Sequence, residues 1–162
     1  DDEFPKKMKS AIGYCAKAKS IIFIGIGQSG YLAEYGARYF ANVGLNSYSV
    51  TDAFFPIPQR DMAGTLIIAL SNSGETMEIL RLSEGYKSRG TKLLSITNHP
   101  TATLAKMSDL CFSYLVPPFS VGEGEQRVDL TTHVPVLYII ESMGMNLLDY
   151  LEGRMRNEGN IF

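Results

Sequence analysis

Three hydroxyl side chains and a glycine lie within six consecutive residues, Ser71-Asn72-Ser73-Gly74-Glu75-Thr76. An apolar run typical of a buried strand, Thr65 to Leu70, comes directly before this hexapeptide, and a helix-like segment opens at its Glu75. The first amides of a helix have no intrahelical partners and carry partial positive charge, so they attract anions. Hydroxyls add donors that can rotate toward several oxygens, and Gly74 lets the backbone approach a ligand. The pattern therefore predicts a pocket for a tetrahedral anionic group.

The same hexapeptide can also be interpreted as a helix cap that binds no ligand. In that case Ser73 would cap the following helix, and Thr76 or Glu75 would close a capping box. A second turn of similar composition, Gly27-Gln28-Ser29-Gly30, follows the first apolar run of the chain. Capping alone does not require two such turns, and their combination favours a binding site.

The composition is that of one soluble globular domain. The chain has 162 residues, of which 45% are apolar and 20% charged, with a net charge of −2 and a pI near 5.7. A chain with this charge has no basic face of its own for nucleic acid. It has no signal peptide and no apolar run near the roughly 20 residues that a membrane span requires, so we expect a cytoplasmic location.

Cys15 and Cys111 are the two cysteines, and we expect both to be buried thiols rather than a disulfide or a metal site. We expect no cofactor and no bound metal. The numbering starts at Asp1 without an initiator methionine, which suggests an excised domain whose partner domain lies outside this chain.

Apolar runs alternate with helix-like segments, which predicts parallel β/α units with right-handed crossovers. The fold class predicted is α/β, a three-layer α-β-α sandwich around a five-stranded parallel sheet of order 2-1-3-4-5. The expected strands are Ser20–Ile26, Ser47–Val50, Thr65–Leu70, Lys92–Thr97 and Leu110–Leu115. The expected helices are Pro5–Lys19, a segment from Gly30 to about Val43, one from Glu75 that stops at Gly90, a short one ending at Met107, and Thr132–Leu151.

In such a sheet the ligand crevice lies at the carboxyl ends of the strands where the winding reverses, between the first and third strands. The turn Gly27–Gly30 follows the first of these strands, and the hexapeptide Ser71–Thr76 follows the third. Two independent turns are therefore expected to converge on one place. That convergence supports a binding site more strongly than either turn does alone.

A dinucleotide site is an alternative use of the first turn, because Gly25 to Gly30 matches Gly-x-Gly-x-x-Gly literally. Asp52, at the end of the second strand, could then hold a ribose. Against this interpretation, a hydroxyl-rich loop on the neighbouring strand would crowd the cofactor. Gln28 and Ser29 also place polar side chains where a pyrophosphate turn mostly presents bare backbone.

From about Ser20 to Leu115 the chain resembles the sugar isomerase (SIS) domain, and the Ser-x-Ser-Gly-Glu-Thr hexapeptide is the most specific part of the likeness. Gly25-Ile-Gly-Gln-Ser-Gly30, Thr97-Asn98 and Ala105-x-x-Ser108-Asp109 fit the family as well. The resemblance implies a flavodoxin-like sandwich that dimerises and binds phosphorylated sugars. By the same resemblance, the ligand is held by Gly27, Gln28, Ser29, Ser71, Asn72, Ser73, Gly74, Glu75 and Thr76.

The family contains both enzymes and sensors. Aldose–ketose isomerisation needs a base beside a carbonyl, and an acid for ring opening or proton return. Glu125 and His99 are the candidates if the chain is an isomerase, with Glu123 and His133 as further ones. Each also has a structural interpretation, because the glutamates lie in a flexible loop, His99 lies in a turn and His133 at a helix start.

Isomerases of the family carry a run of threonine and serine after a proline before the last helix, and Asp129-Leu-Thr-Thr-His-Val-Pro135 departs from that pattern. The segment looks more like the effector-binding half of RpiR-type bacterial transcription regulators, in which this domain follows a helix-turn-helix module. We therefore expect a phosphosugar sensor with no catalytic residue, in which Glu125 and its neighbours in the 123–127 loop meet the sugar. A stand-alone phosphosugar isomerase is the alternative.

We expect a helix packing on the domain at residues 1–19, the phosphosugar-binding domain at 20–152 and a polar tail at 153–162. The helix Thr132–Leu151 is apolar on nearly all sides, which predicts the interface of a homodimer, with a tetramer left open. The expected partners are a phosphorylated sugar and further copies of the chain. DNA is expected to be contacted only through a helix-turn-helix domain absent from this chain, and no membrane is expected.

Overall fold

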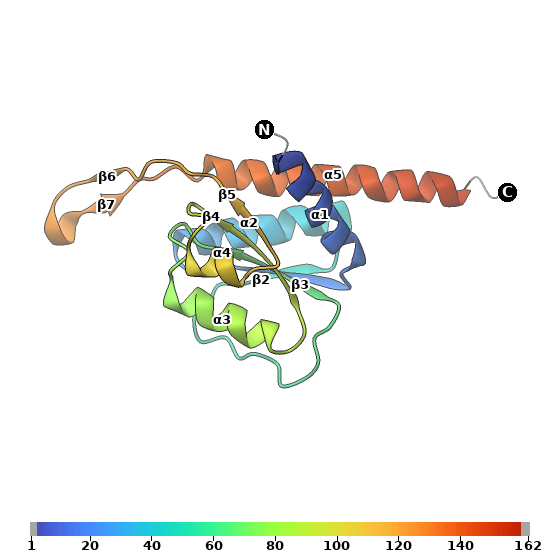
Figure 1. Cartoon of the computed structure of the whole chain (residues 1–162), viewed down its shortest axis with the longest axis horizontal. Coiled ribbons are helices and arrows are strands. Elements are labelled where there is room, and N and C mark those ends of the chain that lie inside the picture. The colour runs from blue at the N-terminus through green and yellow to red at the C-terminus, as the bar shows by residue number, and fades with distance from the viewer. Residues whose placement is uncertain (1–2, 160–162) are drawn as a thin grey trace.

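The structure is a computed structural model that describes residues 3–159, with the surroundings of side chains described through residue 153. Five parallel strands form one sheet in the order β2-β1-β3-β4-β5, and this confirms the predicted topology (Figure 1). The strands are β1 (Ser20–Ile24), β2 (Ser47–Val50), β3 (Thr65–Leu70), β4 (Lys92–Thr97) and β5 (Leu110–Ser113).

Helices cover both faces of the sheet, which makes the molecule the three-layer sandwich that the sequence predicts (Figure 1). Alternate side chains of a strand point to opposite faces and enter two separate apolar cores. In β3, Leu66 and Ile68 join one core, whereas Ile67 and Ala69 join the other. The first core is covered by α1 (Glu3–Lys17), α2 (Gln28–Val43) and α5 (Val134–Gly159), and the second by α3 (Met77–Lys87) and α4 (Thr103–Met107).

Small residues let α2 approach the sheet closely. Ala33, Gly36 and Ala37 are buried on its inner face. A Cβ atom on Gly36 would lie 2.5 Å from the ring of Phe23, so a larger residue does not fit there. Phe23 in turn packs edge to face on Phe40, with the ring centroids 5.0 Å apart. This packing places the first turn of α2 directly at the end of β1.

Some element ends differ from the predicted ones. The strands β1 and β5 end at Ile24 and Ser113, earlier than expected, and α3 begins at Met77 rather than at Glu75. The helix α5 continues to Gly159, so residues 153–159, expected as a polar tail, are helical. Arginine, methionine and glutamate in that stretch have high helix propensity, which outweighs its polarity. Residues 160–162 of the expected tail lie outside the described part of the chain.

Residues 117–129, between β5 and α5, contain a small antiparallel hairpin that we call the arm. In the arm β6 (Ser120–Val121) pairs with β7 (Val128–Asp129), and a short 3-10 helix, η1 (Gly124–Gln126), joins them. Two glycines with positive φ allow the chain to reverse there. Figure 1 shows that the arm reaches away from the body of the molecule, so its tip has few neighbours within this chain.

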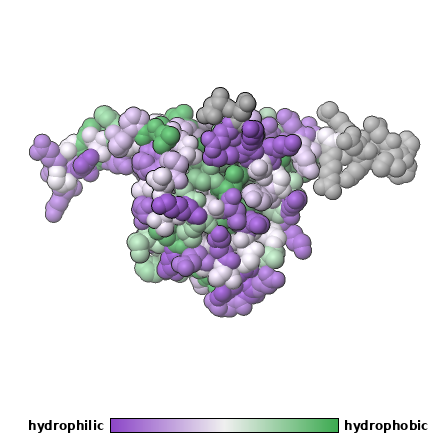
Figure 2. All heavy atoms as spheres, in the orientation of Figure 1, coloured by the Kyte–Doolittle hydropathy of each residue, from purple (hydrophilic) through white to green (hydrophobic). Residues whose placement is uncertain are grey.

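One face of α5 carries apolar side chains that stay more than half exposed within the described part of the chain. Val134, Tyr138 and Met145 are 68%, 63% and 51% exposed, whereas Val136 and Ile140 on the opposite face are buried. Figure 2 shows further apolar residues on the arm and above the start of α5. This exposure agrees with the predicted dimer interface, which stays a prediction. Within residues 3–159, no helix combines the length and apolar character needed to span a bilayer.

Candidate functional site

An open cavity of about 260 Å³ lies at the carboxyl ends of β1 and β3, where the winding of the sheet reverses. Three parts of the chain form it: the turn after β1, the turn after β3 and the segment that leads into α5. The two predicted turns therefore converge as expected, and a third segment joins them. The cavity is lined by Ile26, Gln28, Ser29, Asn72, Ser73, Thr76, Asp129 and His133.

Hydroxyl groups organise the turn after β3. Ser71 Oγ accepts a hydrogen bond from the Gly74 amide at 3.0 Å and lies 3.1 Å from Thr76 Oγ1. Ser73 Oγ accepts a hydrogen bond from the Glu75 amide at 3.1 Å, and its own hydrogen stays free to donate. The cap position of α3 is Thr76, whose side chain makes no capping bond. The interpretation of Ser73 as the helix cap is therefore wrong, because Ser73 closes the turn before the helix.

Gly74 seats this turn against the start of α4. Its φ of 68° lies in the left-handed region, which residues with a side chain rarely adopt. A Cβ atom there would lie 2.5 Å from Ala102 Cβ and 2.8 Å from Thr97 Oγ1. Gly74 and Ser71 are both buried, so they support the turn beneath the cavity, while Ser73 stands exposed above them.

The turn after β1 leads into α2 without an intervening loop. Gly27, with φ 63°, directly precedes the helix, and a Cβ atom on Gly25 would clash with the Ser29 carbonyl. The first residues of α2, Gln28 and Ser29, line the cavity. Because α3 also begins beside the cavity, the partly positive ends of two helices meet at it.

The third segment contributes one carboxylate and one imidazole. Asp129 Oδ1 accepts hydrogen bonds from the hydroxyl and the amide of Thr131, at 2.6 and 2.9 Å. These bonds, with smaller contributions from the nearby His133 and Arg127, hold the pKa of Asp129 below its ordinary value. His133 Nε2 lies 3.2 Å from Gln28 Oε1, and this contact joins the start of α5 to the start of α2.

A tyrosine that sequence reasoning missed orients Asn72. The Tyr114 hydroxyl donates a hydrogen bond to Asn72 Oδ1 at 2.8 Å. The buried side chain of Asn98 holds the segment after β5 in place, because its amide group exchanges hydrogen bonds with the Val116 backbone at 2.8 and 2.7 Å. Burial raises the pKa of Tyr114 to about 12, so the phenol stays protonated. Its position at the end of an apolar run carries no signal of this role.

Several predicted residues do not line the cavity. The Glu75 carboxylate accepts a hydrogen bond from the Thr103 amide at 2.8 Å, so it points to the start of α4, and this bond lowers its pKa. Glu123 and Glu125 are exposed in the arm, and His99 is exposed in the turn after β4. These three side chains are therefore not brought to the hydroxyl groups within this chain.

Asp52, the candidate ribose ligand of the dinucleotide interpretation, has a local role. Its Oδ1 accepts a hydrogen bond from the Phe54 amide at 2.9 Å and so closes the turn after β2. Asp52 does not line the cavity. The dinucleotide interpretation therefore has no acidic partner for a ribose at the predicted position.

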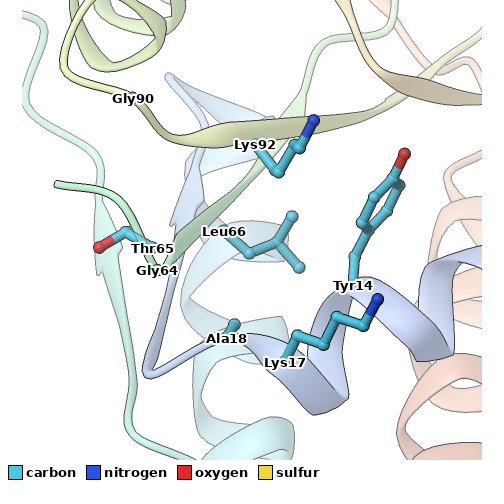
Figure 3. A pocket seen from close by; sticks show the side chains of 8 residues that line it. All are labelled: Tyr14, Lys17, Ala18, Gly64, Thr65, Leu66, Gly90 and Lys92. Atoms are coloured by element: carbon cyan, nitrogen blue, oxygen red, sulfur yellow. The ribbon is translucent and has the colours of Figure 1, made fainter.

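A second cavity, of about 300 Å³, lies at the opposite edge of the sheet, where β3 and β4 begin (Figure 3). Tyr14 and Lys17 from α1 and Lys92 from β4 extend their side chains around it, and Leu66 lies between them. The helix α1 ends at this cavity, and none of the described helices begins there. We therefore place the candidate site at the carboxyl edge, where oriented donors converge.

A model of the SIS domain family matches residues 14–131. Among curated proteins, an uncharacterised HTH-type transcriptional regulator of Clostridium perfringens is 33% identical over 126 residues, which are 76% of this chain and 44% of that protein. The 3-hexulose-6-phosphate isomerase of Methanocaldococcus jannaschii is 31% identical over 96 residues, which are 59% of this chain and 52% of that protein. This chain spans about half the length of these two relatives.

Solved structures show the same fold. A protein of E. coli CFT073 in complex with A5P is 27% identical, with a TM-score of 0.71 over 93% of this chain and 79% of that one. The Vibrio vulnificus NanR protein complexed with ManNAc-6P is 20% identical, with a TM-score of 0.70, and the match covers 96% of this chain and 57% of that one. The sugar isomerase domain of an RpiR transcription factor from Sphaerobacter thermophilus is 17% identical, with a TM-score of 0.63, and the match covers 93% of this chain and 79% of that one.

Proposed function

This chain belongs to the SIS domain family, and on that premise we propose that it binds a phosphorylated sugar as the sensor domain of a transcription regulator. The observation that carries the proposal is the convergence of two helix starts and three hydroxyl side chains on one cavity. Ser29, Ser73 and Thr76 can each donate to a phosphate oxygen, and the first amides of α2 and α3 favour negative charge.

The energies suit a ligand whose affinity depends on its phosphate. A hydrogen bond to a charged group contributes about 1.5–3 kcal/mol net. Micromolar binding requires about 8 kcal/mol, which a few such bonds and the contacts of the sugar ring can supply together. A sugar without its phosphate should therefore bind little above background.

The positions of the titratable groups, and the lowered pKa of the one carboxylate among the described residues that line the cavity, favour sensing over catalysis. Glu125 and His99, the candidates for isomerase chemistry, are not among the described residues that line the cavity. Asp129 does line it, but its hydrogen bonds from Thr131 hold its pKa below the ordinary value. A general base works best with a pKa near the operating pH, so Asp129 is a weak base for proton abstraction.

The regulatory step that we propose uses the arm and α5. The arm ends at Asp129 and α5 begins just after His133, and both residues line the cavity. A bound sugar would order the arm over the ligand and shift the dimer formed through α5. Attached helix-turn-helix modules would then change their spacing, on which binding to two DNA half-sites depends.

A phosphosugar isomerase is the second candidate, and the identity of 31% with the 3-hexulose-6-phosphate isomerase favours it. Catalysis would require Glu125 of the arm to reach a cavity, in the same chain or in a second copy. On this alternative, Glu125→Gln would abolish turnover of the phosphosugar and leave its binding intact. Glu34→Gln, at an exposed position of α2, is the matched control.

The first experiment is a thermal-shift screen of the chain against sugar phosphates, their parent sugars and NAD. A ligand at 100 times its dissociation constant should add about 2.7 kcal/mol, which raises the melting temperature by several degrees. A phosphosugar that stabilises the chain and keeps an unchanged NMR spectrum would support the sensor. Conversion of the same ligand to its isomer would contradict it and support the enzyme, and stabilisation by NAD alone would contradict both.

The role of the hydroxyl turn is tested by Ser73→Ala. Loss of one hydrogen bond to a charged phosphate should weaken phosphosugar binding by about ten- to a hundredfold, measured by isothermal titration calorimetry. Ser73 is exposed, so its removal should leave the melting temperature of the free chain nearly unchanged. Ser10→Ala, at an exposed position of α1, is the control. An unchanged affinity in Ser73→Ala would mean that the hexapeptide only shapes the backbone.

A further inference from the structure

One donor and one acceptor of the cavity are oriented independently of the phosphate-binding turns. We propose, on the premise of the proposed function, that Nδ2 of Asn72 and Oδ2 of Asp129 select a phosphosugar that carries a secondary amide, such as an N-acetylated amino sugar. Both residues line the cavity beside Ser73 and Thr76. They come from different segments, the turn after β3 and the end of the arm.

The donor is directed by a tyrosine. The Tyr114 hydroxyl donates to Asn72 Oδ1 at 2.8 Å, which occupies the carbonyl side of the amide group. Nδ2 of the same group has no hydrogen-bond partner among the described residues and belongs to a side chain that lines the cavity. Asn98 holds the segment that carries Tyr114 through its two bonds with Val116. Tyr114 therefore acts as a positioning residue behind Asn72.

The acceptor is directed in a similar way. Both hydrogen bonds from Thr131 end on Asp129 Oδ1, at 2.6 and 2.9 Å. They hold the carboxylate in one orientation, and within residues 3–159 Oδ2 has no hydrogen-bond partner. A ligand in the cavity can thus meet an N–H donor from Asn72 and an oxygen acceptor from Asp129 whose partner atoms are already bonded.

A secondary amide matches this pair better than a hydroxyl or an amine does. Its planar trans geometry points the C=O and the N–H in opposite directions, so one substituent can accept from Asn72 and donate to Asp129. A hydroxyl has its donor and its acceptor on one oxygen atom, which must then reach both groups from a single point. An ammonium group could pair with the Asp129 carboxylate, but it has no acceptor and would leave the Asn72 donor without a partner.

Isothermal titration calorimetry tests the proposal with pairs of ligands that share the 6-phosphate. We expect N-acetylglucosamine 6-phosphate or N-acetylmannosamine 6-phosphate to bind about tenfold more tightly than glucose 6-phosphate and mannose 6-phosphate, the effect of one additional charge-assisted bond. Tyr114→Phe should reduce this preference to about threefold or less, because the Asn72 amide is no longer held. Asn72→Asp and Asp129→Asn should abolish it.

The controls separate positioning from folding. Tyr39→Phe on α2 and Asp149→Asn on α5 change the same groups elsewhere and should leave the preference at its original value. The affinity for glucose 6-phosphate should stay within about twofold in Tyr114→Phe, because its phosphate contacts persist. An equal loss for acetamido and hydroxyl ligands in that variant would mean a merely structural tyrosine and would overturn the proposal.

The same titrations distinguish a failure of the acetamido preference from a failure of phosphosugar binding. Binding of glucose 6-phosphate without any preference for the acetamido ligands would overturn the role of Asn72 and Asp129 and leave the phosphosugar site intact. A failure of every sugar phosphate to bind would overturn the proposed function together with this inference.

Discussion

The two edges of the sheet carry cavities of similar size, about 260 and 300 Å³, that are built in opposite ways. At the carboxyl edge two helices begin, and the polar groups are amides and short hydroxyls held by hydrogen bonds. At the amino edge α1 ends, and the positive charges are those of Lys17 and Lys92 on long side chains (Figure 3). Helices that connect parallel strands point the same way, so α2 and α3 both begin at the carboxyl edge, where their first amides favour negative charge.

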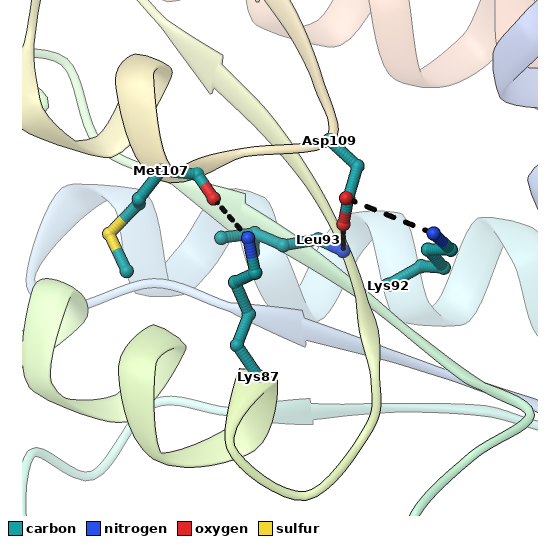
Figure 4. A network of polar contacts seen from close by, with 5 residues as sticks. All are labelled: Lys87, Lys92, Leu93, Met107 and Asp109. Atoms are coloured by element: carbon teal, nitrogen blue, oxygen red, sulfur yellow. Dashed lines mark hydrogen bonds and ion pairs between the residues drawn. The ribbon is translucent and has the colours of Figure 1, made fainter.

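The polar contacts at the amino edge hold the fold together instead. Asp109 Oδ2 accepts a hydrogen bond from the Leu93 amide at 2.9 Å, while Lys92 Nζ lies 3.9 Å from its Oδ1 (Figure 4). Lys87 Nζ donates to the Met107 carbonyl at 2.6 Å, which complements the negative end of α4. These contacts join the ends of α3 and α4 to β4. The lysine side chains at this edge therefore stabilise the packing of the helices on the sheet.

Glycine substitutions should give the largest difference between the two edges. Gly74→Ala combines a left-handed φ with a clash against Ala102 and Thr97, so we expect it to lower the free energy of unfolding by about 3 kcal/mol and to abolish phosphosugar binding. Gly64→Ala at the amino edge has a φ of 90°, but its Cβ would only touch the flexible Lys19 side chain at 3.4 Å. It should lose only about 1 kcal/mol in urea denaturation. Equal losses would mean that the packing of the turn is unimportant.

Substitutions of polar residues at the two edges should differ in their effect on the affinity for the phosphosugar. Ser71→Ala removes the partner of the Gly74 amide and of Thr76, and should lower the free energy of unfolding by about 1–2 kcal/mol and the phosphosugar affinity by about tenfold. The matched change at the other edge, Lys17→Met with Lys92→Met, should leave that affinity unchanged in calorimetry. A tenfold loss in the lysine variant would move the anion site to the amino edge.

The smallest expected effect is on the pH dependence of stability, when a carboxylate of the carboxyl edge is removed. The pKa of Glu75 lies below its ordinary value of 4.5 because its carboxylate accepts from the Thr103 amide. The stabilisation is present above the ordinary pKa and is lost as the pH falls through the lowered one. Between about pH 5 and pH 3, the free energy of unfolding should fall less steeply in Glu75→Gln than in the parent chain. The exposed Glu34→Gln on α2 is the control, and equal slopes in all three would mean that the bond contributes nothing.

Local patterns predicted the frame of the molecule correctly. The bounds of β2, β3 and β4 follow from short apolar runs, and the parallel order follows from their alternation with helical segments. The meeting of Ser29 with Ser73 and Thr76 was also predictable, because strand order alone brings those two turns to one cavity.

Side-chain directions were not predictable in the same way. Glu75 lies in the most specific motif and yet turns to α4, whereas Glu125 belongs to an arm whose direction no periodicity encodes. The contacts of Tyr114 with Asn72 and of His133 with Gln28 join residues 42 and 105 positions apart.

The sequence by itself therefore determined the sheet, its order and the meeting of two turns rich in glycine and hydroxyl groups, since these depend on local hydrophobic spacing and on strand order. Only the tertiary structure decided which polar groups of Asn72, Asp129 and His133 complete the cavity. The physical reason is that a side chain takes its orientation from neighbours that folding brings to it, and such neighbours are far away along the chain.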